Sequence, residues 1–257
     1  MDRTNRHLCP AWWLLATAAT LLVGCAGTKV TQLERDPGFT FSRMGTNGIA
    51  VAYVAVRARD DKEEGAVTPH EMTSLLHRSI TNETDGFTLL GPGDVGFTDD
   101  AVGHLVARYE KTGVLRGSEV AELDSLLEGG AQYLVFARID ENATGQKEVT
   151  NVSTDEETEK KTTKTTLSAR RSLAISFDVY DLRAGTVSMT TVISGSLTNE
   201  RMFEETESEP GRGLMGFIAG LFSGTPNYEY PPPPSTRDVA GRVFDTFSKQ
   251  LPEPPKN

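Results

Sequence analysis

Cysteine and histidine are scarce in this sequence, and their scarcity limits the chemistry it can carry. The 257 residues include two cysteines and four histidines. His70-Glu71 begins like the helical motif of zinc proteases, but Ser74 stands where that motif needs its second histidine. The sequence also lacks a Gly-x-Ser-x-Gly elbow and a phosphate-binding P-loop. We therefore expect no metal, no cofactor and no enzymatic activity, and we place the histidines on helix surfaces.

The chain also lacks a surplus of basic residues. Lysine and arginine total 26 against 36 aspartates and glutamates, which gives a formal net charge of −10. Nucleic-acid binding needs a basic footprint, and so does broad electrostatic docking on anionic lipid. The composition therefore predicts no nucleic-acid partner and no membrane contact through a basic surface.

The N-terminus has the features of a secretory signal. Arg3 and Arg6 precede an apolar run over residues 11 to 23. As a helix this run is roughly 20 Å long, which is short of the ~30 Å core of a bilayer. The small residue Gly24 and then Cys25 follow the run. A basic start, a short apolar stretch and a small-residue cleavage site are typical of a signal peptide.

The four residues Leu22-Val23-Gly24-Cys25 resemble the lipobox of bacterial lipoproteins. This resemblance implies that residues 1 to 24 are removed and that Cys25 carries lipid, including palmitate, which anchors the protein in a membrane. Ala26, where the enterobacterial sorting rule would have Asp for the inner membrane, favours the outer membrane with the protein facing the periplasm. The alternative is an ordinary secretory signal or a membrane anchor that contains a cysteine. Because Cys9 would leave with the signal, stability must then come from a packed core and not from a disulfide.

The rest of the chain is predicted to form one domain, over residues 48 to 251, between a lipidated tether at 25 to 47 and a flexible tail at 252 to 257. Thr68, Pro69 and Glu71 form a capping-box pattern that begins a helix. Period-two alternation predicts an antiparallel hairpin. The expected elements are strands at 49 to 56, 87 to 90 and 133 to 139, helices at 68 to 84, 99 to 111, 118 to 127 and from Ser235, and hairpin strands at 173 to 179 and 187 to 193.

This order predicts an α/β (α+β) fold, in which helices pack on a mixed β-sheet that contains a long antiparallel hairpin. Three stretches, GIAVAYVAV, LLEGGAQYLVFARI and SLAISFDVYDLRAGTVSMTTVISGSL, resemble periplasmic lipoproteins related to the curli secretion channel subunit, to the amino-terminal domain of TolB and to penicillin-binding-protein activators. The resemblance is one of layout and covers roughly residues 48 to 250. It implies a protein that binds other proteins of the envelope.

A charged, threonine-rich hairpin insert is predicted at residues 141 to 166. Its charged residues would be costly on a lipid-facing surface, so we expect no pore of the curli type. Asp155 and the glutamates that follow it lack the spacing of an EF-hand, and we interpret them as a solvated hairpin tip.

An excursion from the domain is predicted at residues 204 to 234. It contains an apolar island, which is interpreted either as a helix buried on the sheet or as a surface that binds a partner or the membrane. The residues proposed for this surface are Leu214, Phe217, Ile218, Leu221 and Phe222.

Taken together, these features predict a lipid-anchored, non-enzymatic periplasmic protein that binds unidentified envelope proteins in assembly, transport or cell-wall synthesis. An alternative is a homo-oligomeric structural or secretion-channel accessory ring. A more remote alternative is an envelope hydrolase, since an acidic chain can supply paired carboxylates.

Overall fold

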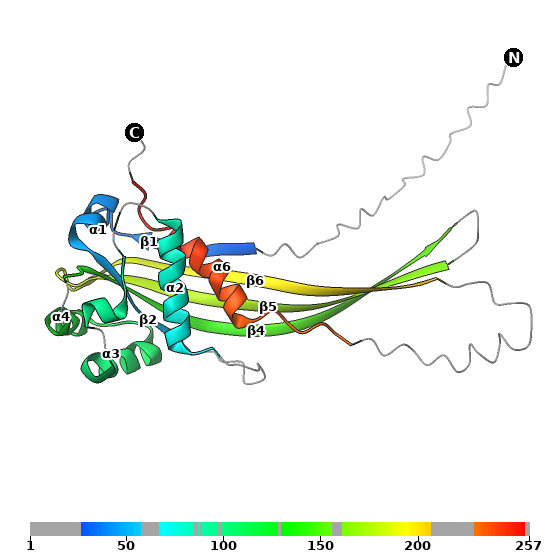
Figure 1. Cartoon of the computed structure of the whole chain (residues 1–257), viewed down its shortest axis with the longest axis horizontal. Coiled ribbons are helices and arrows are strands. Elements are labelled where there is room, and N and C mark those ends of the chain that lie inside the picture. Colours follow the sequence, from blue (N-terminus) through cyan, green and yellow to red (C-terminus); the bar gives the residue numbers. More distant parts are fainter. Residues whose placement is uncertain are drawn as a thin grey trace, which may run out of the picture.

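A computed structural model describes residues 27–57, 67–84, 87, 89–96, 99–127, 130–155, 161–206 and 229–254. These residues form a six-stranded mixed sheet in the order β1-β6-β5-β4-β2-β3 with helices packed on it, which confirms the predicted fold class (Figure 1). The strands are β1 (Gly27–Arg35), β2 (Ile49–Val56), β3 (Leu89–Leu90), β4 (Tyr133–Thr154), β5 (Lys161–Asp181) and β6 (Thr186–Thr206). The helices are α1 (Phe41–Asn47), α2 (Pro69–Glu83), α3 (Asp99–Thr112), α4 (Gly117–Leu126) and α6 (Thr236–Ser248), with a 3-10 helix η1 (Pro92–Val95).

Strand β2 is the strand around which both hydrophobic cores form. Its sequence IAVAYVAV is buried along almost its whole length. It runs parallel to β3 and β4, whereas the adjacent pairs β4–β5, β5–β6 and β6–β1 are antiparallel. A strand covered on both faces needs apolar residues at consecutive positions, which is why this segment has no polar alternation.

Helices α2 and α6 cover one face of the sheet (Figure 1). Helix α2 begins at the predicted capping box, in which Thr68 Oγ1 accepts from the Glu71 amide at 3.3 Å and a Glu71 carboxylate oxygen accepts from the Thr68 amide at 3.0 Å. Phe247 of α6 stacks on Phe177 of β5 with ring centroids 4.2 Å apart. A Cβ on Gly195 would lie 2.5 Å from a methyl group of Val243, so this glycine allows α6 to approach β6 closely.

Helices α3 and α4 pack on the opposite face, at one end of the sheet. Tyr109 of α3 lies against Phe136 of β4, which in turn lies edge-on to Tyr180 of β5. Together with buried residues of β2, α3 and α4 these rings form a second core. The end of α3 and the start of α4 are thereby fixed to the sheet.

The strands β4, β5 and β6 continue well beyond the helices as a three-stranded ribbon (Figure 1). Strand β2 pairs with β4 only as far as Ile139, and β1 pairs with β6 only as far as Ser196. We call the ribbon beyond this point the arm. It consists of residues 144 to 154, 161 to 171 and 197 to 206. Strands rise about 3.3 Å per residue, so the arm is roughly 35 Å long.

Three predicted segments differ from the structure. Residues 27 to 47, expected as a tether, form β1 and α1. Strand β1 lies at the edge of the sheet and pairs with β6 through its backbone. Its side chains are mostly exposed. Residues 141 to 154 and 161 to 166 are not a separate insert, since they continue β4 and β5 without a break in pairing at the arm. Residues 204 to 206, expected to start the excursion, are the end of β6.

The described part of the excursion lies along the sheet. Asn199 Nδ2 donates to the Pro232 carbonyl at 2.8 Å, and Arg171 Nε donates to the Pro234 carbonyl at 2.6 Å. These bonds fix the proline segment between the base of the arm and α6. No helix among the described residues is both long enough and apolar enough to cross a membrane.

Candidate functional site

The predicted lipidation site Cys25 lies outside the described residues, as do Leu214, Phe217, Ile218, Leu221 and Phe222. The description begins at Gly27, which pairs with Ser196 at the base of the arm. Both predictions therefore stay predictions. What the structure adds is the point of the fold at which the N-terminal segment enters.

The three histidines that the structure describes lie on α2 and α3 in different surroundings. His70 is exposed, and His77 is half-buried beside Gly91. His104 Nε2 lies 3.0 Å from a carboxylate oxygen of Glu122 on α4. Among the described residues no group of three histidine, cysteine or acidic side chains is arranged to hold a metal ion.

An open cavity of about 490 Å³ lies between α2 and η1, and the residues that line it include Ser74, His77, Arg78 and Asp94. Nucleophilic catalysis requires a base within hydrogen-bond reach of the nucleophile. Ser74 makes no such bond to His70 or His77 in the described structure. Ser74 and these histidines therefore do not form a hydrogen-bonded catalytic pair in the described structure.

A second group of polar side chains is buried where β4, β5 and α3 meet. Asp178 accepts hydrogen bonds from Thr190 Oγ1 at 2.7 Å and from Tyr109 Oη at 3.1 Å. Burial raises the pKa of the Asp178 carboxyl, and these two hydrogen bonds partly offset the effect. Burial also raises the pKa of the Tyr180 hydroxyl well above its usual range, so the hydroxyl stays protonated and its oxygen accepts the hydrogen bond from the Leu115 amide.

Beside Asp178, Arg138 bonds to Asp140 at 2.5 Å, and Ser176 donates to the same carboxylate. The guanidinium of Arg138 lies directly against Gly113, where a Cβ would come within 2.0 Å of Nη1. Gly113 has a φ of +73° and terminates α3. The glycine therefore serves both to end the helix and to leave room for the arginine.

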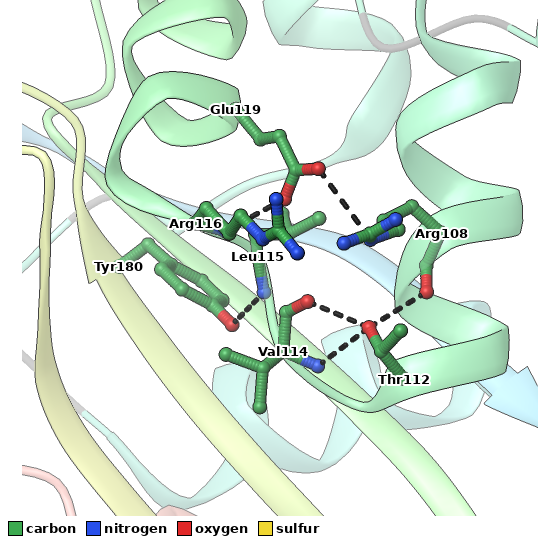
Figure 2. Close-up of polar contacts among 7 residues, drawn as sticks. All are labelled: Arg108, Thr112, Val114, Leu115, Arg116, Glu119 and Tyr180. Carbon is green, nitrogen blue, oxygen red and sulfur yellow. Dashed lines mark hydrogen bonds and ion pairs between the residues drawn. The ribbon is translucent and has the colours of Figure 1, made fainter.

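Figure 2 shows how the α3–α4 junction is tied to this region. Glu119 accepts from the Arg116 amide at 2.7 Å and lies 3.5 Å from Arg108 Nε. The Leu115 amide donates to Tyr180 Oη on β5 at 3.0 Å. The Arg108–Glu119 ion pair joins α3 to α4, and the Leu115–Tyr180 bond joins their junction to β5, so these two contacts stabilise the position of α3 and α4.

The arm differs from these regions in having exposed charged side chains on its two outer strands. Lys147, Glu148, Glu200 and Arg201 are all exposed. Exposed apolar side chains accompany them on the outer strands, namely Val149 (36%), Val152 (55%) and Met202 (64%). No described strand covers the outer edge of β4 or of β6 along the arm. Such edges present unpaired backbone donors and acceptors and are ready templates for pairing with another chain.

Sequence reasoning did not identify this surface. Thr, Val and charged residues alternate along residues 144 to 154 without an apolar face, so the segment has the composition of a solvated loop. The β-branched threonines and valines were the available signal for strand, since such residues favour extended backbone.

Comparison with known proteins does not assign the chain to a family, because no family model and no curated protein matches it. Among solved structures, the PelC dodecamer from Paraburkholderia phytofirmans is 10% identical with a TM-score of 0.34, over 85% of this chain and 96% of that one. The hypothetical protein CT253 from Chlamydia trachomatis is 14% identical with a TM-score of 0.31, over 79% and 94%. Lipoprotein GNA1162 from Neisseria meningitidis is 12% identical with a TM-score of 0.27, over 67% and 92%. Similarities at this level carry no argument about function, and the resemblance to the curli and TolB group stays a prediction.

Proposed function

We propose that this protein is a lipid-anchored, non-enzymatic protein of the bacterial envelope that acts by binding other envelope proteins. The observation that carries the proposal is the arm, a ribbon that extends past the helices and leaves both backbone edges uncovered by any described strand. Strand addition at an exposed edge is a common mode of protein recognition. The lipobox-like residues 22 to 25 support the anchor and, with Ala26, an outer-membrane location facing the periplasm.

The anchor and the arm are close to each other in this proposal. Strand β1 begins two residues after Cys25, and its first residue, Gly27, pairs with Ser196 where β6 enters the arm. A lipid on Cys25 would hold the protein beside the base of the arm. The arm would then be presented at a constant distance from the membrane surface, which suits a protein that meets other membrane-associated partners.

A site-specific photo-crosslinker tests the proposal in cells. We place it at Val152 on the arm and, as a matched control, at Val114 between α3 and α4, because both side chains are 55% exposed. We expect envelope proteins to be captured from position 152 and not from position 114. Equal capture from the two positions, or no envelope protein other than this chain from position 152, would contradict the proposal.

The anchor has its own test. Cys25→Ala should abolish labelling by palmitate, and the precursor should keep residues 1 to 24 because the lipoprotein peptidase acts on the modified cysteine. Labelling that persists in this variant would show that the lipid is elsewhere.

The non-enzymatic part of the proposal predicts that incubating the purified protein with peptidoglycan releases no soluble fragments, whereas release of fragments would favour the hydrolase alternative.

A further inference from the structure

The two open edges of the arm belong to strands that run in the same direction. Strands β4 and β6 are each antiparallel to β5, so they are parallel to each other, and both run toward the tip of the arm. If a second copy placed its β6 beside β4 of the first, the two strands would form a parallel pair. Both arms would then point the same way.

The charged residues of the two edges lie at the same level along the arm. Lys147 and Glu200 both pair with Ser168, so they stand at opposite ends of one row across the ribbon. In the next row, Glu148 and Arg201 both pair with Leu167. Each row therefore has a positive charge at one edge and a negative charge at the other, and the order of the signs reverses between the two rows.

The backbone pattern of the ribbon allows its two edges to pair in this register. In an antiparallel ladder, opposite residues alternate between pairs that exchange backbone hydrogen bonds and pairs that do not. In a row of three residues, the β5 residue directs its N–H and C=O toward only one of its two neighbours. That neighbour directs its own backbone groups inward to β5, and the residue on the other outer strand directs them outward. A parallel ladder needs one residue of each kind in every row. The residue whose N–H and C=O face the other strand bonds to the two residues that flank the one opposite it.

We propose that copies of this protein join edge to edge through the arm, with β4 of one copy paired in register with β6 of the next. In this register Lys147 lies beside Glu200 of the next copy, and Glu148 lies beside its Arg201. A shift by two residues in either direction removes both charge pairs. A shift by four places Lys147 beside Glu204 but takes Glu148 away from Arg201, so only the in-register arrangement keeps two attractive pairs.

This pairing joins two different edges, so each added copy brings a further free edge, and the association continues into a row or closes into a ring. Every copy also has the same orientation, and the starts of all β1 strands lie on one side of the assembly. The inference goes beyond the proposed binding function and does not depend on lipid at Cys25. Its partner is a second copy of this chain.

Paired cysteines test the register in the full-length chain. Val149 and Met202 both pair with Thr166 and share one face of the arm. Within one chain they are two strand spacings apart, roughly 10 Å, which is too far for a disulfide. Across the proposed contact their Cα atoms would be about 5 Å apart, within disulfide range. Val149→Cys with Met202→Cys should therefore give a ladder of covalent oligomers when membranes of producing cells are oxidised.

The controls distinguish this register from random collision. Mixing the two single-cysteine variants should give covalent dimers and nothing larger, because each chain then contributes one edge. Val152→Cys with Met202→Cys should give no ladder, since Val152 lies on the opposite face and in another row. The wild-type chain controls for its native cysteines, and unchanged unfolding midpoints control for the fold. Monomer alone from the Val149 and Met202 pair, or an equal ladder from the Val152 and Met202 pair, would overturn the proposal.

Discussion

Gly113 shows how one residue can serve a helix end and a buried charge at the same time. Gly113→Ala should lower the free energy of unfolding by at least about 1 to 2 kcal/mol, because an alanine is strained at its positive φ. The loss should be larger still, since the new Cβ would push Arg138 away from Asp140. Urea unfolding of the wild type and the variant measures the difference.

Gly103→Ala is the matched control for that substitution. Gly103 lies inside α3, and a Cβ there would meet no atom within 4 Å. Alanine is the better helix former by about 1 kcal/mol, so this variant should be more stable than the wild type. If the two alanine variants changed stability in the same direction, the role assigned to Gly113 would be wrong.

The buried carboxyl of Asp178 makes stability depend on pH. Its folded-state pKa lies above the ordinary value of 3.8, so between the two values the folded chain holds a proton that the unfolded chain has lost. The contribution of this group to stability is therefore greatest at low pH and falls as the pH rises through that interval. Asp178→Asn cannot titrate, and it also gives up one of the two accepted hydrogen bonds.

We therefore expect Asp178→Asn to be less stable than the wild type below pH 4 and the gap to narrow as the pH rises toward neutrality. Unfolding midpoints of both proteins at matched pH values measure this difference in stability. The other titrating groups are common to the two chains, so their effects cancel in the comparison. A gap that widens with increasing pH would show that the folded-state pKa is lowered and not raised.

At the scale of the element, the start of α2 gives a direct test of helix capping. Thr68→Ala removes the side-chain acceptor for the Glu71 amide and should cost about 1 kcal/mol. Thr81→Ala in the same helix is the control, because the Thr81 hydroxyl donates to the His77 carbonyl within the helix and caps neither end. Thermal unfolding should separate the two variants. Equal losses would mean that the capping box contributes no specific stability.

The elements that could be predicted from the sequence are those whose burial imposes a period. Helix α2 and the inner parts of β5 and β6 have one buried face, and β2 has two, so their apolar residues recur at regular spacing. Strand β1 and the outer part of β4 are exposed on both faces and have no such period. Their structure depends on backbone pairing with strands far away in the sequence, which composition does not encode.

The same reasoning applies to the candidate site. Lipidation at Cys25 stays a prediction, and the sequence alone can make it because a lipobox is a local motif of consecutive residues. The edges of the arm could not, because Lys147 and Glu200 come to the same level only through the registers of β4 and β6 with β5. Each charge taken alone resembles an ordinary solvated residue.

At the scale of the whole molecule, the fold divides into a compact part and a projecting part with different kinds of stabilisation. Two hydrophobic cores lie on opposite faces of the sheet and hold the helices. The arm is a ladder of three strands, with Leu167 and Ala169 buried on its middle strand, and the proline segment bonds to its base. Substitutions of exposed side chains along the edges of the arm should therefore change association without changing the stability of the domain.

The charges of the arm give the last prediction. Lys147→Glu places a carboxylate beside Glu200 of the next copy, and Glu200→Lys places two lysines together, so each change should reduce the oligomer yield of the Val149→Cys, Met202→Cys chain. Replacing attraction by repulsion at an exposed pair shifts the association by roughly 0.5 to 1.5 kcal/mol, which is about twofold to tenfold. The two reversals together restore opposite signs and should recover the yield. The losses should shrink at high salt, since exposed charges are screened. A double reversal that forms no more oligomer than either single variant would show that these charges do not set the register.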